Sequence, residues 1–250
     1  MSDLLIQVQD LHNQGFTHRK IGELLDHDTS WVLRRLKKLN ISGNNYNFFE
    51  PTPDHMPVLV GTMMGDGSLK LNSKMTHARM SLNHGPVQKD YLQWKVDYFG
   101  SLFKKSLTQD QHIDGRTGKR YGGWYNTSRQ HPWLTEWRHI FYPEGKKVVT
   151  EEILSYIDDQ ALAIWWCDDG GTDSSEKGRY KFHTGNLSSS EYELLYAWFS
   201  AQGFDPHIYY RTENSVMYIF RAEGSRELRR RISPYIPESM LYKFNRHLGG

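Results

Sequence analysis

An apolar segment that ends in Asp-Gly occurs twice in this chain, and this repeat constrains the fold more than any other feature. The first segment ends at Asp66-Gly67 and the second at Asp169-Gly170, an offset of 103 residues. Each is followed by strand-like text, an amphipathic helical pattern, more strand-like text and a last helical pattern. A chain that repeats one order of elements over such a distance is expected to form two similar halves.

The aspartates at these two helix ends predict a metal site. The last turn of a helix already concentrates negative charge, because its carbonyl oxygens lack intrahelical partners. A carboxylate added there supplies the oxygen ligands that Mg²⁺ and Ca²⁺ prefer. Small residues recur four apart in both segments, at Gly61 and Gly65 and at Ala163 and Cys167. This spacing would let the helices pack side by side, and two adjacent carboxylates repel unless a cation lies between them.

Composition limits the kind of metal and the compartment. The chain has 250 residues and a single cysteine, which excludes an internal disulfide framework and a cysteine-rich zinc site. It has no run of about eighteen apolar residues and no signal-peptide pattern at its start, so we expect a cytoplasmic protein with no membrane partner. A formal net charge of +2 neither requires nor excludes a nucleic-acid partner.

The first forty residues carry a helix-turn-helix pattern. Thr17 is the predicted N-cap of a second helix, and Thr29 or Ser30 that of a third. The third helix presents a basic face that could reach phosphates and base edges, made of Arg34, Arg35, Lys37 and Lys38. The alternative is a solvated face on a three-helix packing unit. We predict a DNA-binding domain over residues 1–42 and a linker over residues 43–54.

The two Asp-Gly segments resemble the signature motifs of a known family. LVGTMMGDG (residues 59–67) and LAIWWCDDG (residues 162–170) are similar to the paired motifs of LAGLIDADG homing endonucleases. The stretches YPEGKKVVTEEILSYIDDQALAIWWCDDGG and PYIPESMLYKF extend this resemblance over residues 55–247. It departs from the family pattern at Thr62, Met63 and Met64 and at Ile164, which stands in place of a glycine, but both aspartates are retained.

This resemblance implies an α+β fold and a reaction. Two pseudo-symmetric αββαββα halves, residues 55–150 and 151–250, would place two antiparallel sheets as a saddle in the major groove of double-stranded DNA. The implied protein is a monomer that cuts both strands of a long, asymmetric target with Mg²⁺, for which Mn²⁺ or Ca²⁺ would substitute in binding. The motif helices would form the interface between the halves, so we expect Trp165 and Trp166 to be core residues.

The resemblance also assigns roles to individual residues. The implied metal ligands are the carboxylates of Asp66 and Asp169 and the main-chain oxygens of Gly65 and Asp168. Lys147 and Lys243 would polarise water or stabilise developing charge near each scissile phosphate, which makes them catalytic together with the two aspartates. Lys146 takes the place of Lys147 if the register shifts by one residue.

Further basic residues fall where the saddle strands and their loops are expected. They are Arg79, Arg116, Lys119, Arg120, Arg179, Lys181 and Arg211. Side chains alternate along a strand, so only every second one can face DNA, and the sequence leaves the parity open. The loop group around Arg116 fits a solvated face as well as it fits a phosphate-binding site.

Two other functions fit the same sequence. One is an RNA maturase that binds intron RNA and assists splicing, and the other is a DNA-binding transcriptional regulator that does not cut. The retained aspartates argue against the regulator. A nuclease should lose cutting but keep DNA binding when Asp66 or Asp169 is replaced, whereas RNA binding by a maturase should survive the change.

Overall fold

The chain forms two compact units in this computed structural model, which describes residues 3–14, 16–39, 48–71, 77–113, 118, 120–172, 179–185, 187–212 and 215–244. Residues 1–51 and 100–102 make up the first unit, and residues 52–99 and 103–250 make up the second. Residues 43–47 of the predicted linker lie outside the described residues. Within the described ranges, no helix has the length and apolar character needed to cross a membrane.

The first unit is a three-helix cluster. Its helices are α1 (Asp3–Asn13), α2 (His18–Leu25) and α3 (Thr29–Lys38). One side chain or two from each helix fill its core, namely Val8, Ile21, Val32 and Leu36, all with no exposed surface. The three helices are therefore present as predicted, each with one buried stripe.

Side-chain caps fix where α2 and α3 begin. The Thr17 side chain accepts a hydrogen bond from the backbone N–H of Lys20, as predicted. The prediction for α3 was wrong by a residue: its N-cap is Asp28, whose carboxylate accepts from the backbone N–H of Trp31 at 2.7 Å. A carboxylate is as good a cap as a hydroxyl, so the helix begins earlier than a Thr29 or Ser30 cap would place it.

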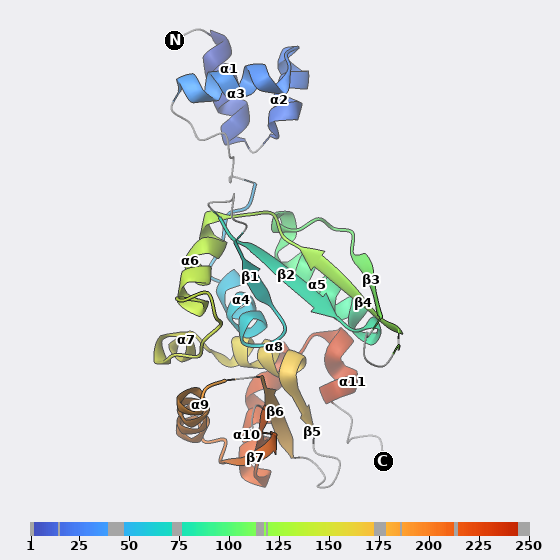
Figure 1. The fold of residues 1–250 in the computed structure, drawn as a ribbon, viewed down its shortest axis with the longest axis vertical. Coiled ribbons are helices and arrows are strands. Elements are labelled where there is room, and N and C mark those ends of the chain that lie inside the picture. Colours follow the sequence, from blue (N-terminus) through green and yellow to red (C-terminus); the bar gives the residue numbers. More distant parts are fainter. Residues whose placement is uncertain are drawn as a thin grey trace. The chain divides into compact units, whose positions relative to one another are not determined.

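The second unit contains the same order of elements twice (Figure 1), which confirms the predicted α+β fold of two αββαββα halves. The first half runs α4 (His55–Met64), β1 (Ser68–Lys70), β2 (Arg79–His84), α5 (Lys89–Tyr98), β3 (Thr108–Ile113), β4 (Arg120–Thr127) and α6 (Pro132–Phe141). The second half runs α8 (Asp159–Asp169), β5 (Gly170–Thr172), β6 (Tyr180–Thr184), α9 (Ser189–Ala201), β7 (Pro206–Thr212), β8 (Ser215–Phe220) and α10 (Ala222–Ile232). Short α7 (Glu151–Ser155) precedes the second half, and α11 (Leu241–Phe244) follows it.

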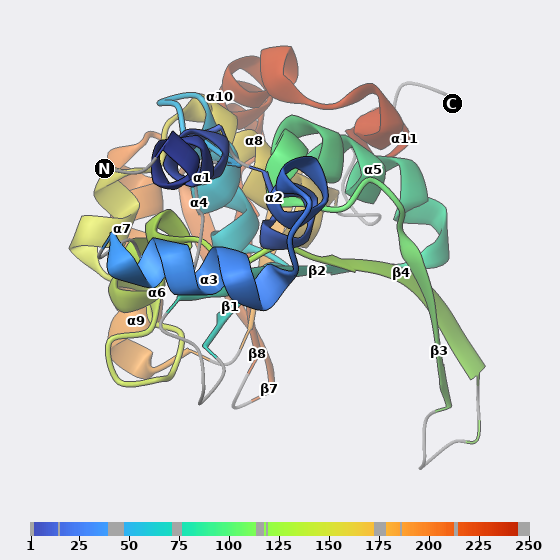
Figure 2. The same ribbon diagram turned by 90° about the horizontal axis from the view of Figure 1, so that it is seen from above.

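Each half has a four-stranded antiparallel sheet with helices packed on it. The strand order is β1-β2-β4-β3 in one sheet and β5-β6-β8-β7 in the other. Helices α5 and α6 contact the first sheet, and α9 and α10 contact the second. Figure 2 shows the β3–β4 hairpin extending away from the helices of its half. The other face of each sheet is the more exposed one, because buried and less buried residues alternate along β2 and β6.

Helices α4 and α8 form the buried centre of the second unit. All residues of α4 from Pro57 to Met64 are buried, as are those of α8 from Ala161 to Cys167. Trp165 and Trp166 are 1% and 0% exposed, which confirms them as core residues. A helix that is apolar on every side can be stable in water only in such an interior position.

Glycine allows these two helices to approach closely. A Cβ atom added to Gly61 would lie 2.3 Å from the Ala161 carbonyl oxygen and 2.8 Å from the Ile164 Cβ, and one on Gly65 would lie 2.4 Å from the Asp168 Cβ. The small residue is thus needed on α4, and Ile164 fills the space that Gly61 leaves. The predicted side-by-side packing of the motif helices is confirmed, and it brings both acidic helix ends together.

Candidate active site

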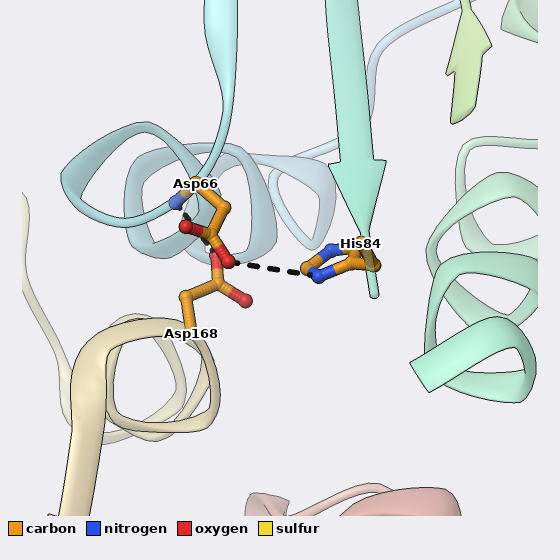
Figure 3. Close-up of side chains that lie close together, drawn as sticks. All are labelled: Asp66, His84 and Asp168. Atoms are coloured by element: carbon orange, nitrogen blue, oxygen red, sulfur yellow. Dashed lines mark hydrogen bonds and ion pairs between the residues drawn. The ribbon is translucent and has the colours of Figure 1, made fainter. Parts of the chain in front are cut away.

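Asp168, rather than Asp169, faces the acidic end of α4. The backbone N–H of Asp66 donates a hydrogen bond to Asp168 Oδ2 at 3.2 Å (Figure 3). The Asp168 side chain is completely buried, whereas that of Asp66 is 42% exposed. The Asp168 side chain therefore anchors the end of α8 to the backbone of Asp66. From the sequence, a role was predicted only for the main-chain oxygen of Asp168.

Lys95 of α5 neutralises Asp168. Its Nζ donates to Oδ1 at 2.8 Å and to Oδ2 at 2.9 Å, and the Lys95 side chain has no exposed surface. The same ammonium lies 4.5 Å from the centre of the Tyr91 ring, a cation–π contact. A buried ion pair with both carboxylate oxygens occupied leaves Asp168 little capacity to hold a metal ion.

His84, the last residue of β2, lies between Lys95 and Asp66. Its Nε2 is 3.3 Å from Lys95 Nζ. Its Nδ1 is 3.6 Å from Asp66 Oδ2, the contact that Figure 3 draws. Burial and, after it, the charge of Lys95 lower the pKa of His84 to about 4. The imidazole is thus neutral near pH 7.

Asp66 and Asp169 line one cavity of about 310 Å³ together with Lys147. Asp169 accepts a hydrogen bond from the Trp165 indole Nε1 at 3.2 Å. The remaining wall consists of Met64, Gly65, Val148, Val149, Trp165, Thr184, Gly185, Leu187 and Leu195. The predicted pair of aspartates and one predicted lysine thus share one cavity at the ends of the two motif helices.

The two predicted lysines cap the two motif helices in the same manner. Lys147 donates to the Gly65 and Gly67 carbonyl oxygens at 3.0 and 3.3 Å. Lys243 of α11 donates to the Cys167 and Asp168 carbonyl oxygens at 2.7 and 3.1 Å. Each ammonium therefore meets the negative end of a helix. The register with Lys147 rather than Lys146 is the one that places an ammonium at α4.

Burial and neighbouring carboxylates raise the pKa values of both cavity-lining aspartates. Burial, followed by the charges of Asp66 and Asp168, raises the pKa of Asp169 to about 7. Partial burial and the charge of Asp168 also raise the pKa of Asp66. Burial lowers the pKa values of Lys147 and Lys243, against the opposing effect of the carboxylates. Repulsion among the acids is already reduced by protein ammonium groups, so it is a weaker argument for metal than the sequence suggested.

The donor set fits a hard divalent ion at Asp66 and Asp169. Both carboxylates reach the cavity, and oxygen ligands of this type suit Mg²⁺, Mn²⁺ and Ca²⁺. Ligand atoms of Asp66, His84 and Asp168 also lie within 4.8 Å of one another. That second group fits less well, because Lys95 already takes the place of a cation there. The predicted ligands Gly65 O and Asp168 O accept hydrogen bonds from the lysines, and each keeps a second lone pair.

The strands place three predicted DNA-binding residues on the more exposed faces of the two sheets. Arg79 and Lys181 occupy partly exposed positions that alternate with buried ones in β2 and β6, and Arg179, just before β6, has the parity of Lys181. For these three residues, this resolves the parity that the sequence left open. For Arg120 in β4 and Arg211 in β7 only the backbone is described, and Arg116 and Lys119 lie outside the described residues.

Helix α3 of the first unit presents most of its basic residues to solvent. Arg34, Lys37 and Lys38 are exposed, while the Arg35 guanidinium stacks on the Trp31 ring at 3.9 Å. Three of the four predicted side chains are thus accessible. DNA binding by them stays a prediction.

Comparison with known proteins identifies the family. Residues 56–226 match the LAGLIDADG DNA endonuclease family, which is more than half of the chain. The chain belongs to this family. The resemblance found in the two motifs is thereby confirmed, and both motif segments lie within the matched residues.

Individual relatives of this LAGLIDADG protein carry different names. It is 28% identical over 220 residues to the protein RecA of Mycolicibacterium chitae, covering 81% of this chain and 50% of that protein. It is 25% identical over 235 residues to the cytochrome b mRNA maturase bI2 of Debaryomyces hansenii, covering 88% and 86%. The chain spans about half the length, or less, of these RecA relatives.

A solved structure confirms the LAGLIDADG fold. The homing endonuclease I-WcaI, bound to its DNA recognition sequence, matches with a TM-score of 0.71 at 19% identity. The match covers 85% of this chain and 92% of that one. At this level of identity the likeness establishes the fold.

The sequence analysis missed His84 and Lys95. A signal for Lys95 existed, since it lies on the buried face of α5 with Tyr91, Leu92, Val96 and Phe99. A lysine on an apolar helix face needs a buried acid as partner. Nothing in the sequence indicated which acid, because Asp168 is 73 residues away.

Proposed function

We propose that this protein is a site-specific DNA endonuclease that cuts both strands of a long, asymmetric target with a divalent metal ion, Mg²⁺ by preference. The observation that carries the proposal is the pair of motif aspartates, Asp66 and Asp169, which line one cavity with Lys147 at the ends of two packed helices. One chain supplies both acids, so a monomer suffices. Family membership supports DNA as the substrate.

The chain's own residues would hold the reacting groups in place. Asp66 and Asp169 would hold the metal through carboxylate oxygens. When bound, the metal lowers the pKa of the attacking water and neutralises charge on the scissile phosphate. Lys147 and Lys243, fixed by hydrogen bonds to the helix-end carbonyls, present positive charge where the cleaved phosphate develops negative charge.

The sheets would supply the DNA contacts. Arg79, Arg179 and Lys181 lie on the more exposed strand positions, and phosphate contacts of this kind position a duplex without reading its sequence. The two halves differ in sequence, so the bases that they read should differ and the target should be asymmetric. We further propose that α3 of the first unit extends the contact to more phosphates.

Selection of cleaved sites from a randomised DNA library tests the proposal. Wild-type protein with Mg²⁺ should enrich one long recurrent sequence that carries double-strand breaks. The Asp66→Asn, Asp169→Asn double variant should enrich none, and neither should wild type in EDTA. The proposal fails if wild type cuts no library member while it retains DNA affinity.

A maturase function is the second candidate, and one observation favours it. The similarity to the D. hansenii maturase covers most of both chains, unlike that to the RecA proteins. In that case the double aspartate variant should still bind intron RNA and promote its splicing. A splicing assay with both proteins therefore separates this function from cleavage.

A further inference from the structure

Lys95, His84 and Asp168 form a connected set of contacts next to Asp66, and the proposed mechanism uses none of their side chains. Lys95 Nζ contacts both oxygens of Asp168 and lies 3.3 Å from His84 Nε2. Asp168 Oδ2 accepts from the Asp66 backbone N–H, and His84 Nδ1 lies 3.6 Å from the Asp66 carboxylate. The side chains of His84, Lys95 and Asp168 are 0% exposed.

The direction of these contacts fixes the His84 tautomer. An ammonium group can only donate, so Nε2 must accept from Lys95. In a neutral imidazole the other nitrogen, Nδ1, then carries the proton. Nδ1 lies 3.6 Å from Asp66 Oδ2, which is beyond hydrogen-bond distance, so Lys95 sets the polarity of the nitrogen nearest the Asp66 carboxylate.

The backbone of Asp66 is held by the same set. Asp168 is fixed by Lys95 and in turn accepts from the Asp66 N–H. Both the main chain and the carboxylate of Asp66 are therefore positioned from Lys95, once through Asp168 and once through His84. A shift of the Lys95 ammonium would disturb both contacts together.

The second half places uncharged residues at the matching positions. The strand registers show which positions match. Ser68 and Gly171 each lie two residues after a motif aspartate, and they pair with Ser81 and Lys181, which are 100 residues apart. The same offset relates His84 to Thr184 at the strand ends.

The same offset of 100 residues aligns buried positions of α5 with buried positions of α9. It relates Leu92 to Tyr192 and Phe99 to Phe199, all of them buried. It relates Lys95 to Leu195, which is completely buried and lines the cavity with Asp169 and Thr184. The acid of the second motif thus has a hydroxyl and an alkyl group where Asp66 has an imidazole and an ammonium.

We propose that Lys95 is a positioning residue that acts through His84 and Asp168 on Asp66 alone, so that cleavage of one DNA strand depends on this network and cleavage of the other does not. The proposal rests on the proposed endonuclease function for its strand dependence. Its structural part, the tautomer of His84, is independent of that function.

Nitrogen-15 spectroscopy of the full-length, metal-free protein tests the structural part. In wild type, His84 should show an unprotonated Nε2 and a protonated Nδ1, assigned among the twelve histidines by comparison with His84→Leu. The Lys95→Met, Asp168→Asn double variant should lose this tautomer preference; the double change avoids leaving a buried carboxylate without a partner. A protonated Nε2 in wild type would overturn the proposal.

Strand-resolved cleavage tests the functional part on a supercoiled plasmid that carries the selected target, with each strand end-labelled in parallel assays. His84→Leu and the Lys95→Met, Asp168→Asn variant should slow one strand about tenfold to a hundredfold more than the other, so that nicked circles accumulate. His84→Asn keeps an N–H donor near the Nδ1 position and should recover part of the balance. The matched control is Leu92→Met, which changes a buried α5 residue outside the cavity and should leave the ratio of strand rates within about twofold of wild type.

The outcomes separate the two claims. Equal slowing of both strands, or an unchanged ratio in the network variants, overturns the positioning role while the endonuclease function stands. Absence of any cutting by wild type overturns the proposed function, and the spectroscopic result still decides the tautomer. Thermal unfolding of every variant shows whether a loss of rate reflects a loss of fold.

Discussion

Asp168 and Asp169 are neighbours in the sequence with different surroundings in the structure. Successive residues of a helix point about 100° apart, so only one of two adjacent side chains can face the partner helix. Asp168 faces α4 and is neutralised by Lys95, whereas Asp169 opens into the cavity that Asp66 also lines. One acid thus joins the helices, and the other stays available for a cation.

The pKa of Asp169 predicts how metal-free stability depends on pH. Because this pKa is raised from 3.8 to about 7 in the folded state, the folded protein binds the proton more tightly than the unfolded chain. The resulting stabilisation is complete below pH 3.8 and is lost as the pH rises to about 7. Asp169→Asn should therefore raise the melting temperature of the metal-free protein at pH 8.

The size of that gain should shrink toward pH 5, where wild-type Asp169 is already protonated. Mg²⁺ should also stabilise wild type more at pH 8 than at pH 6 and should stabilise Asp169→Asn less at either pH. Calorimetric scans in EDTA and in Mg²⁺ measure all of these shifts. A melting temperature of Asp169→Asn at or below that of wild type at pH 8 would contradict the assignment.

At the scale of elements, the contact of α4 with α8 determines the site. Its glycines are the feature of the sequence from which packing could be predicted, because Gly61 and Gly65 recur one helical turn apart. Ile164 interrupts the same pattern in α8, and the structure shows that it packs into the space over Gly61. The two helices are thus complementary rather than identical.

Gly61→Ala should destabilise the protein by about 1–3 kcal/mol, because its Cβ would meet the Ala161 carbonyl oxygen, a backbone atom that cannot move alone. Urea unfolding followed by tryptophan fluorescence measures the change. The matched control is Gly85→Ala, where an added Cβ has nothing within 4 Å and the backbone φ is −63°. Equal stability of the two variants would show that α4 and α8 do not approach so closely.

The features of these elements that could be predicted are those that depend on residues close together in the sequence. The order of helices and strands, the Asp-Gly helix ends and the Thr17 cap follow from short-range patterns, and the structure confirms them. The buried partners of Lys95 and His84 do not, since they come from segments far apart in the chain. Which side chains of each strand face outward likewise could not be predicted, because this depends on which sheet face the helices cover.

At the scale of the whole molecule, one chain combines a two-half LAGLIDADG unit with a three-helix unit. The formal net charge of +2 hides an uneven distribution, because Arg34, Lys37 and Lys38 project from a single helix. The overall charge thus could not predict this surface, but the helical spacing did. The contribution of the first unit to DNA binding can be tested without removing it.

Replacement of Arg34, Lys37 and Lys38 by glutamine should weaken DNA binding and reduce its salt dependence. If each side chain contacts one phosphate, the slope of log affinity against log salt should fall by about 0.9 per residue. Cleavage at saturating protein should be unchanged. Replacement of Lys20, Lys104 and Lys105 by glutamine removes the same number of charges and provides the control. An equal effect of this control would argue against a specific role for α3.

The central claim is that Asp66 and Asp169 each serve cleavage and not DNA binding. The most direct test compares wild type with the single variants Asp66→Asn and Asp169→Asn on the selected target, with affinity measured in Ca²⁺ and cleavage in Mg²⁺. We expect both variants to bind within about threefold of wild type and to cut at least about a hundredfold more slowly. Cutting at the wild-type rate by either variant would contradict the claim, because that aspartate would then be a structural part of its helix end.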